Sequence, residues 1–440
     1  MRRIRTNPLV QTLVSLKGNP RACVFTEPLF GLSINLCLPF ASVYMLALGF
    51  GDKQIGLLAS VTSLSQGVFA FLSGPITDKA GRRKGLVVSD FIAWCVPCLI
   101  WMASSDFRLF FAAAVINGVR MIAESAWGCL LVEDAKKDQI IHIYTWVYIC
   151  GNLTSLFAPI ASILISRYSI VAAMRILYLN AFVVMGAKVS LLFIFSRETA
   201  VGAARLRETK GRSVFSLLLG YGGVARAILK SPGAAFATFI YTLISIVGLV
   251  NATFWQVIVN KEIGVPDSML PILIMARSLV SLLFYFTAAP RVDRARLKNP
   301  LLLGFASYFA GQALLALAPA GGASAWRFAL LGVSVLFDIA GAGLLPMLAI
   351  SLAQLHADEK DRARVLALLQ MAVMFLSMPF GYIGGLLSDR GRSLPFVMNL
   401  ALVAAGMAAT AIHFRKADPG GDAGAGAGGN AGAGAGAGSP

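Results

Sequence analysis

Long apolar segments recur along the whole chain and constrain its fold more than any other feature. A helix that crosses a bilayer needs about 20 mostly apolar residues. Segments of that kind lie near residues 24–50, 54–77, 86–103, 108–131, 139–166, 169–195, 233–259, 267–290, 300–318, 326–352, 364–387 and 393–414. Only 13% of the residues are charged, which is too few for the surface of a soluble protein of this length. The sequence therefore predicts an all-α polytopic membrane protein with twelve transmembrane helices.

The longest polar stretch divides these segments into two sets of six. We expect a cytoplasmic N-terminal segment at 1–23, a six-helix bundle at 24–195, a central cytoplasmic loop at 196–232 and a second six-helix bundle at 233–414. The tail at 415–440 is mostly Gly and Ala. It has too few apolar side chains to form a core, and we expect it to be disordered.

Lys and Arg are distributed as the positive-inside rule requires. The chain has 38 Lys and Arg against 21 Asp and Glu, a formal net charge of +17. With the N-terminus in the cytoplasm, 27 of the basic residues fall on that side and seven on the other. One missing or extra span would destroy this alternation. The excess charge therefore indicates a cell-membrane protein with both termini cytoplasmic, and it does not indicate a nucleic-acid partner.

Two pairs of matching segments indicate an internal repeat. Gly74-Pro-Ile-Thr-Asp78-Lys-Ala80 aligns with the segment from Ala289 to Ala295, at an offset of 215 residues. Gly118-Val-Arg120-Met-Ile-Ala-Glu124 aligns with Gly332-Val-Ser334-Val-Leu-Phe-Asp338, at an offset of 214. Parallel repeats of six helices are a transporter architecture in which the binding site lies between the halves near the midplane.

The loop between spans two and three carries a family resemblance. Its sequence, Gly74-Pro-Ile-Thr-Asp78-Lys-Ala-Gly81-Arg82-Arg83-Lys84, resembles the signature loop of the major facilitator superfamily of secondary transporters. Gly118-Val-Arg120 in span four resembles a second motif of that family. The resemblance covers roughly residues 24–414 and implies two pseudo-symmetric six-helix bundles. In the second half the signature is altered, with Ala289 in place of the first Gly.

The resemblance also implies that this loop gates the cytoplasmic side. Gly81 permits a tight turn, and Asp78 can cap a helix and pair with a basic residue. Glu133-Asp134 and Glu198 are plausible partners for the basic loop. The alternative is a generic basic loop that only sets topology. The expected gate residues are Gly74, Asp78, Gly81, Arg82, Arg83, Lys84, Glu133, Asp293 and Arg294.

Ionisable groups at membrane depth cost several kcal/mol and normally mark a pathway. Arg120 and Glu124 lie one helical turn apart on one face of span four, and Asp338 holds the repeat-equivalent position in span ten. Fixed ion pairs that only specify packing are the alternative. The expected coupling and cavity residues are Asn117, Arg120, Glu124, Lys188, Asn251, Trp255, Arg277 and Asp338. Trp255 also fits an interfacial anchor, and Glu27-Pro28 is typical of a helix beginning.

No motif for catalysis or for nucleotide hydrolysis is present in the sequence. It contains no phosphate-binding loop, and its three histidines lie far apart. Cys95-Val-Pro-Cys98 has metal-site spacing, but it lies inside a span with no His nearby, so buried thiols are the expected state. Gly- and Pro-rich stretches in spans five and eleven are expected to weaken those helices. We therefore expect a non-enzyme without cofactors or metals.

These patterns predict a secondary active transporter that moves a small polar or amphiphilic solute by alternating access. We expect the proton gradient to drive it, with Glu124 or Asp338 as the proton carrier, and we expect a monomer in the bilayer. Two alternatives remain open: a lipid or glycolipid flippase on the same scaffold, and a non-transporting membrane sensor or scaffold. The sequence leaves the solute and the direction of transport open.

Overall fold

The computed structural model describes residues 8–136, 139–214, 216, 232–287, 297–317, 325–355 and 362–417. All regular structure in those residues is helical. The helices of the first half are α2 (Pro8–Ser15), α3 (Gly18–Cys37), η1 (Leu38–Phe40), α4 (Ala41–Ala47), α5 (Asp52–Ala80), α6 (Arg82–Asp90), η2 (Phe91–Cys95), α7 (Val96–Ala103), α8 (Phe107–Asn117), α9 (Arg120–Val132), α10 (Ile140–Thr154), η3 (Ser155–Phe157), α11 (Ala158–Tyr168), α12 (Ile170–Phe195) and α13 (Ala200–Glu208). Those of the second half are α16 (Pro232–Lys261), η4 (Asp267–Met269), α17 (Leu270–Thr287), α18 (Lys298–Ala316), α19 (Ala325–Leu355), α20 (Arg362–Arg390) and α21 (Leu394–Ala417).

Eleven helices in the described part of the chain are long and apolar enough to cross a membrane. They match eleven of the twelve expected spans, mostly within a few residues. The remaining expected span, near 300–318, coincides with α18, which packs along α19 and α21. The chain is therefore a polytopic helical membrane protein, as its apolar segments predict.

Three of the spans are irregular at or beside a proline, and a fourth, Phe107–Val132, is interrupted between α8 and α9 without a proline. The first span is interrupted by the 3-10 turn η1, which contains Pro39, and the fifth by η3, just before Pro159. A π-helical turn, η2, precedes Pro97 in the third span. Proline lacks the N–H of a regular helical hydrogen bond, so the backbone adjusts there. The expected weakening of span five is present, whereas α20 continues through Pro379.

The prediction that a helix begins at Glu27 is wrong. The helix α3 begins at Gly18, and Glu27 lies in its middle with only 8% of its surface exposed. Pro20 occupies the first turn, the position where proline fits without loss of a hydrogen bond. Pro28 is instead tolerated within the helix. The helix therefore begins beside Pro20 and not at Pro28.

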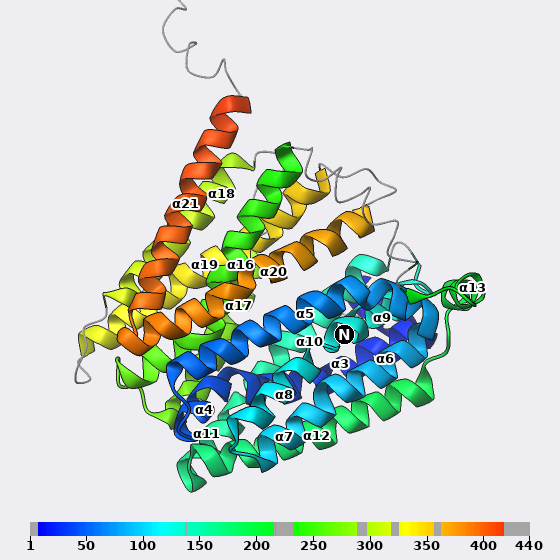
Figure 1. Ribbon diagram of the computed structural model, residues 1–440, viewed down its shortest axis with the longest axis horizontal. Helices are drawn as coiled ribbons and strands as arrows, with labels where there is room; N and C mark the ends of the chain where they lie inside the picture. Colours follow the sequence, from blue (N-terminus) through cyan, green and yellow to red (C-terminus); the bar gives the residue numbers. More distant parts are fainter. Residues whose placement is uncertain are drawn as a thin grey trace, which may run out of the picture.

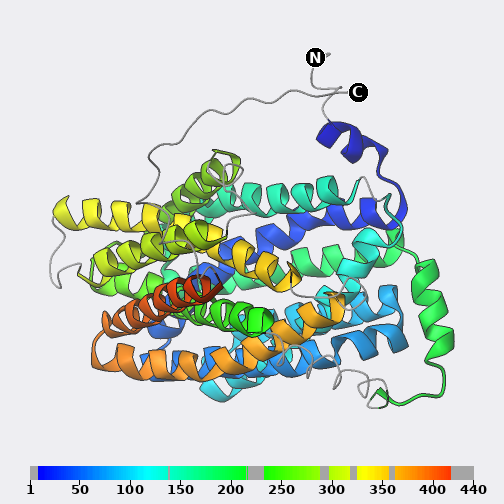
Figure 2. The same ribbon diagram turned by 90° about the horizontal axis from the view of Figure 1, so that it is seen from above.

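The segment expected to be the central loop also contains a helix. α13 begins after Thr199, whose hydroxyl accepts a hydrogen bond from the N–H of Gly202 at 2.9 Å. Such an N-cap stabilises a helix start. α13 packs against α5 and runs across the ends of the other helices (Figure 2).

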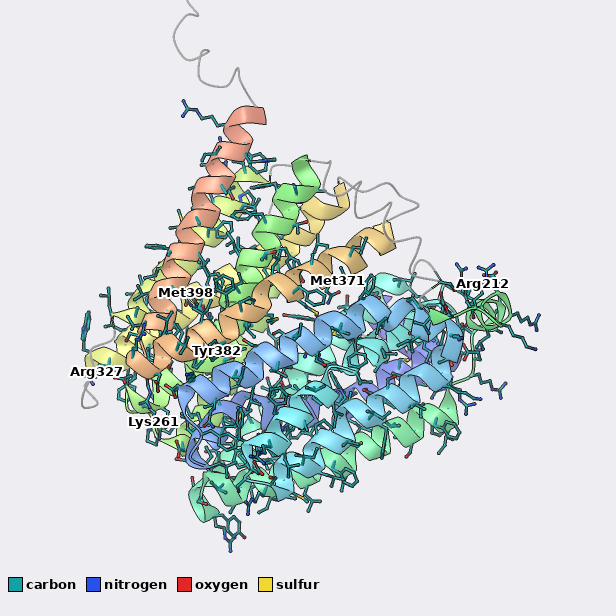
Figure 3. The ribbon with its side chains drawn as sticks, viewed as in Figure 1. Arg212, Lys261, Arg327, Met371, Tyr382 and Met398 are labelled. Atoms are coloured by element: carbon teal, nitrogen blue, oxygen red, sulfur yellow. The ribbon has the colours of Figure 1, made fainter. Side chains whose placement is uncertain are left out.

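The two halves of the chain meet most closely along α5 and α20 (Figure 1). A Cβ atom added at Gly56 would lie 2.8 Å from Cα of Gly385, so glycines permit this approach. The Ser60 hydroxyl donates to the carbonyl of Met378 at 2.5 Å and accepts from the N–H of Tyr382 at 2.7 Å. Tyr382 lies on the side of α20 that faces α5 (Figure 3).

The helix α5 runs from one end of the molecule, the Asp52 end, to the other, the Asp78 end. Lys261 and Arg327 lie toward the Asp52 end, and Arg212 lies at the opposite end (Figure 3). This separation agrees with the charge alternation in the sequence, which assigns Lys261 and Arg327 to one side of the membrane and Arg212 to the other.

Candidate functional site

The signature loop turns sharply between α5 and α6. Gly81 has φ +84°, and a Cβ atom at this position would lie 2.6 Å from Oε2 of Glu198. The Glu198 carboxylate accepts hydrogen bonds from the N–H groups of Arg82 at 2.8 Å and Arg83 at 3.1 Å. A carboxylate at a helix N-terminus satisfies unpaired N–H groups and the helix dipole. Glu198 therefore fixes the start of α6, and glycine is required at the turn.

The side chain of Arg82 connects two acidic residues on different helices. Its guanidinium is 2.6 Å from Asp78 and 3.2 Å from Glu133 at the end of α9. Glu133 also accepts a hydrogen bond from the hydroxyl of Thr199. Arg82 is almost completely buried, so these contacts are shielded from water. The expected pairing of Asp78 and Glu133 with the basic loop is present.

These contacts join α5, α6, α9, α12 and α13, which all belong to the first half. Arg83 donates to the carbonyl of Phe193 and lies 4.4 Å from the centre of its ring. Gly74 lies near the end of α5, and Lys84 in the first turn of α6. The second-half counterparts, Asp293 and Arg294, lie outside the described residues. The described contacts brace the Asp78 end of the first half.

A second cluster of polar groups is buried in the other half of the molecule, around Asp338 on α19. The carboxylate of Asp338 forms an ion pair with Arg277 on α17. It also accepts hydrogen bonds from Gln312 at 2.9 Å and Asn251 at 3.2 Å. The Arg277 guanidinium lies 5.2 Å from the ring centre of Trp255. Three donors therefore stabilise the charged carboxylate in a nearly dry position, 2% exposed.

Further amides extend this network to α18 and α21. Asn399 donates to Gln312 at 2.8 Å and to Asn251 at 3.3 Å, and Asn251 lies 3.2 Å from the hydroxyl of Tyr308. A Cβ atom at Gly311 would be 2.9 Å from the backbone nitrogen of Asp338, so α18 and α19 are in close contact. Five helices of the second half are thereby tied to one carboxylate.

A cavity of about 340 Å³, termed here the side cavity, lies within the first half. Five charged side chains line it: Glu27, Asp90, Arg120, Glu124 and Lys188. Lys188 and Asp90 form an ion pair at 2.7 Å, and both are nearly completely buried. The sequence marked Lys188 as a charge within a span without indicating its partner, which is Asp90 of α6.

Arg120 and Glu124 are also paired, but more loosely. Their closest charged atoms are 3.9 Å apart, and about half of the Glu124 side chain is exposed. Arg120 also lies 3.4 Å from the side-chain oxygen of Gln66 on α5. Asn117, expected on the same stripe, instead donates to the carbonyl of Ala93 at 2.9 Å. The two loosely held groups therefore face the side cavity, and Asn117 bonds to the third span.

A second cavity of about 290 Å³, termed the central cavity, lies between the two halves. Most of its lining comes from the first half, and Leu249, Ala252 and Thr253 on α16 supply the remainder. The lining is mainly apolar and aromatic, with several hydroxyl and amide groups and no charged side chain among the described residues. Trp94 and Ile34 line both cavities, so the two spaces adjoin.

The expected cavity residues are thus divided among three places. Arg120, Glu124 and Lys188 line the side cavity, and Asn117 lines the central cavity. Asp338, Arg277, Asn251 and Trp255 form the second-half cluster and line neither cavity. Trp255 is 1% exposed, which contradicts an interfacial anchor.

The sequence reasoning missed Asp90, Gln312 and Asn399, and it dismissed Glu27. Each of them lies within an expected span, and this position in the sequence could have identified them as candidates. An acidic or amide side chain inside an apolar span needs a hydrogen-bond or charge partner, even when it belongs to no known motif.

The chain matches the family model of the Major Facilitator Superfamily over residues 25–372. It is 29% identical over 160 residues to the multi-drug resistance efflux pump PmrA of Streptococcus pneumoniae, a match covering 33% of this chain and 38% of that protein. It is 27% identical over 135 residues to the uncharacterized MFS-type transporter YqjV of Bacillus subtilis, covering 30% and 33%. The matches therefore span about a third of the length of these curated relatives.

Solved transporter structures share the fold at low sequence identity. The nucleoside transporter NupG superposes with a TM-score of 0.69 at 14% identity, covering 90% of this chain and 98% of that chain. The peptide transporter POT in complex with sulfate superposes with a TM-score of 0.66 at 13% identity, covering 94% and 99%. At such identity the likeness establishes the arrangement of helices, and it does not transfer a solute.

Proposed function

The chain belongs to the Major Facilitator Superfamily, and on that premise we propose that it is a secondary active transporter of a small amphiphilic solute. The solute occupies the central cavity, and two six-helix bundles, 24–195 and 233–414, rock about it. The protein lies in the cell membrane with both termini cytoplasmic. Membrane transport is the activity of the family as a whole.

The central cavity is the observation that carries this proposal. It lies between the halves, and residues of both halves line it. Its walls are apolar and aromatic, with hydroxyl and amide groups from residues such as Ser42, Gln66 and Thr253. A few polar groups on an apolar wall are typical of small-molecule sites. An uncharged or weakly polar amphiphile matches such a lining better than a strongly charged solute.

The contacts between the halves support alternating access. At the Asp52 end, Arg392 lies 3.5 Å from Asp52 and 3.9 Å from Glu262. Ser162 on α11 also donates to the carbonyl of Ser268 in η4. At the Asp78 end, the ion pairs of Arg82 with Asp78 and Glu133 join helices of the first half only. In the proposed topology this is a state closed to the outside, and the braced signature loop moves with the first bundle as a gate.

Coupling to protons is assigned to Glu124 and Asp338. Glu124 is half-exposed to the side cavity and only loosely held by Arg120, so a proton can reach it and release the pair. Asp338 exchanges its proton only when Arg277 withdraws, because Arg277, Gln312 and Asn251 stabilise its charged form. Neutralising a buried carboxylate frees its partner cation, and this is the step that can link protonation to helix movement.

Transport by purified protein in proteoliposomes tests the proposal. A thermal-stabilisation screen with uridine, dialanine and ethidium selects the solute, and its flux is then followed with and without an imposed pH gradient. We expect the gradient to accelerate flux in the wild type and in the exposed control Glu208→Gln. Both Glu124→Gln and Asp338→Asn should lose the acceleration.

Each negative result has a separate meaning. Full gradient-driven flux in both variants would contradict coupling through these carboxylates. Acceleration by a sodium gradient alone would replace the proton with Na⁺. Movement of lipid-linked substrates but not of soluble ones would favour the flippase, which the apolar lining also suits. Absence of any flux would favour a sensor or scaffold.

A further inference from the structure

Glu27 is a buried carboxylate on the wall of the side cavity. It lies in the middle of α3 and is 8% exposed, and its side chain lines the cavity. Among the described residues it has neither a hydrogen bond nor an ion pair. A charged group in such a position is costly unless it is paired. A ligand in the cavity would supply the missing partner.

The charged groups around Glu27 indicate the sign of the charge that such a ligand would carry. Of the two cations that line the cavity, Lys188 is paired with Asp90 at 2.7 Å, and Arg120 is shared between Glu124 and Gln66. With all five groups ionised, three carboxylates face two cations, so the cavity carries one excess negative charge. An anion would have to compete with Asp90 and Glu124 for their partners, whereas a cation would complete the balance.

The remaining walls suit an organic cation better than a bare metal ion. Trp94 and Trp127 line the side cavity, and the faces of tryptophan rings attract cations more strongly than other aromatic side chains. The buried indole N–H of Trp127 has no hydrogen-bond partner among the described residues, so it can donate to an oxygen of the ligand. A metal ion would need several oxygen ligands, and the described residues hold no metal-binding group of His, Cys, Asp and Glu.

We propose that the side cavity binds an organic cation, a protonated or quaternary amine, through Glu27. The ammonium group lies against the Glu27 carboxylate and the tryptophan faces, with a polar substituent near Trp127. The cavity volume of about 340 Å³ accommodates a small amine. This site is distinct from the uncharged central cavity, although the two adjoin at Trp94. Equilibrium binding at this site does not depend on whether the protein transports the bound amine.

Choline and its uncharged isostere 3,3-dimethyl-1-butanol provide a matched pair of probes. Titration calorimetry on the purified full-length protein, in detergent and without a membrane gradient, measures their binding. We expect choline to bind at least about tenfold more tightly than the isostere, a difference of about 1.4 kcal/mol. Equal affinity of the two probes, or no binding of choline, would overturn the proposal without any variant.

Variants then locate the site. Glu27→Gln should weaken choline binding at least about tenfold, and Glu27→Asp should retain most of it. The exposed control Glu208→Gln should bind as the wild type does.

Unchanged binding in a folded Glu27→Gln protein would place the cation elsewhere. Equal competition by NaCl and tetramethylammonium chloride would show a site for any cation. Should Glu27→Gln fail to fold, the two wild-type probes and Glu27→Asp still decide the result. These experiments measure binding and not flux. A negative binding result would therefore not contradict the proposed transport activity, which the proteoliposome assay tests.

Discussion

Asp52 at the start of α5 accepts a hydrogen bond at 2.7 Å from the hydroxyl of Ser388 near the end of α20, although 336 residues separate them. Both side chains are buried, so water does not compete for this bond. One turn further along α5, Gly56 lies against Gly381 and Gly385. The bond and the glycine contacts together close the Asp52 end of the boundary between the halves.

Replacing Gly56 with alanine should weaken this closure. A new Cβ atom would lie 2.8 Å from Cα of Gly385, and backbone atoms of two packed helices cannot yield without separating. Overpacking of this kind costs about 1–3 kcal/mol. We expect the unfolding midpoint of the purified protein to fall. Gly186→Ala on α12 is the control, because a Cβ atom there has no neighbour within 4 Å; an equal fall in both variants would contradict a specific contact.

The losses of stability from removing Arg277 and from removing Asp338 should not be additive. Asp338→Asn leaves Arg277 without its counter-charge, and we expect a loss of about 1–3 kcal/mol, below the range for a fully buried pair because Arg277 is 27% exposed. Arg277→Gln combined with Asp338→Asn should lose less than the sum of the two single changes. Denaturant unfolding of the four proteins gives this coupling.

The exposed pair Arg205–Glu208 is the matched control for that cycle. Its coupling should be near zero, because solvent screens exposed ion pairs. Additive losses at Arg277 and Asp338 would show that the buried pair does not act as a unit.

Truncating Glu198 should release the first turn of α6. Glu198→Ala removes the acceptor of two backbone N–H groups, those of Arg82 and Arg83. Loss of a helix cap costs about 0.5–2 kcal/mol. We expect faster amide hydrogen exchange at residues 82–86 and a smaller effect from Glu198→Gln, which keeps an oxygen acceptor. Unchanged exchange in Glu198→Ala, as expected for the exposed control Glu208→Ala, would refute this role.

The six cysteines should differ in reactivity according to their burial. All are free; Cys129 and Cys150 are partly exposed, and the other four are buried. We expect N-ethylmaleimide to label at most these two in the native protein and all six after denaturation, as counted by mass spectrometry. Rapid labelling of Cys95 or Cys98 in the native protein would show that the CxxC segment is accessible and would favour a metal site there.

Much of the fold could be predicted because hydrophobicity acts locally along the chain. The bilayer requires about 20 apolar residues for each crossing, and α12 and α16 each coincide with an expected span. Short polar helices gave no such signal. The segment that forms α13 was expected to be a loop because it is polar. Its helix is stabilised by the Thr199 cap and by packing against α5, and neither is visible as an apolar pattern in the sequence.

The site was predicted less well than the fold. Charges within spans are rare and costly, which is why Arg120, Glu124 and Lys188 were expected in a cavity; in the structure all three line the side cavity, and their role in coupling stays a prediction. The sequence could not show that amides of α16 and α18 surround Asp338, because these partners lie on other helices. Glu27 was missed because a carboxylate before a proline is also typical of a helix beginning.

The sequence by itself determined that the chain crosses a membrane many times and approximately where the long apolar helices run. Those properties depend on the transfer of each segment from water to lipid, which is nearly independent of its neighbours. Only the tertiary structure decided which charges meet: Lys188 with Asp90, 98 residues away, and Asp338 with Arg277. Helical periodicity places a residue on a face of its own helix. The rotation and tilt of that helix against the others then select its partner, and they leave Glu27 unpaired among the described residues.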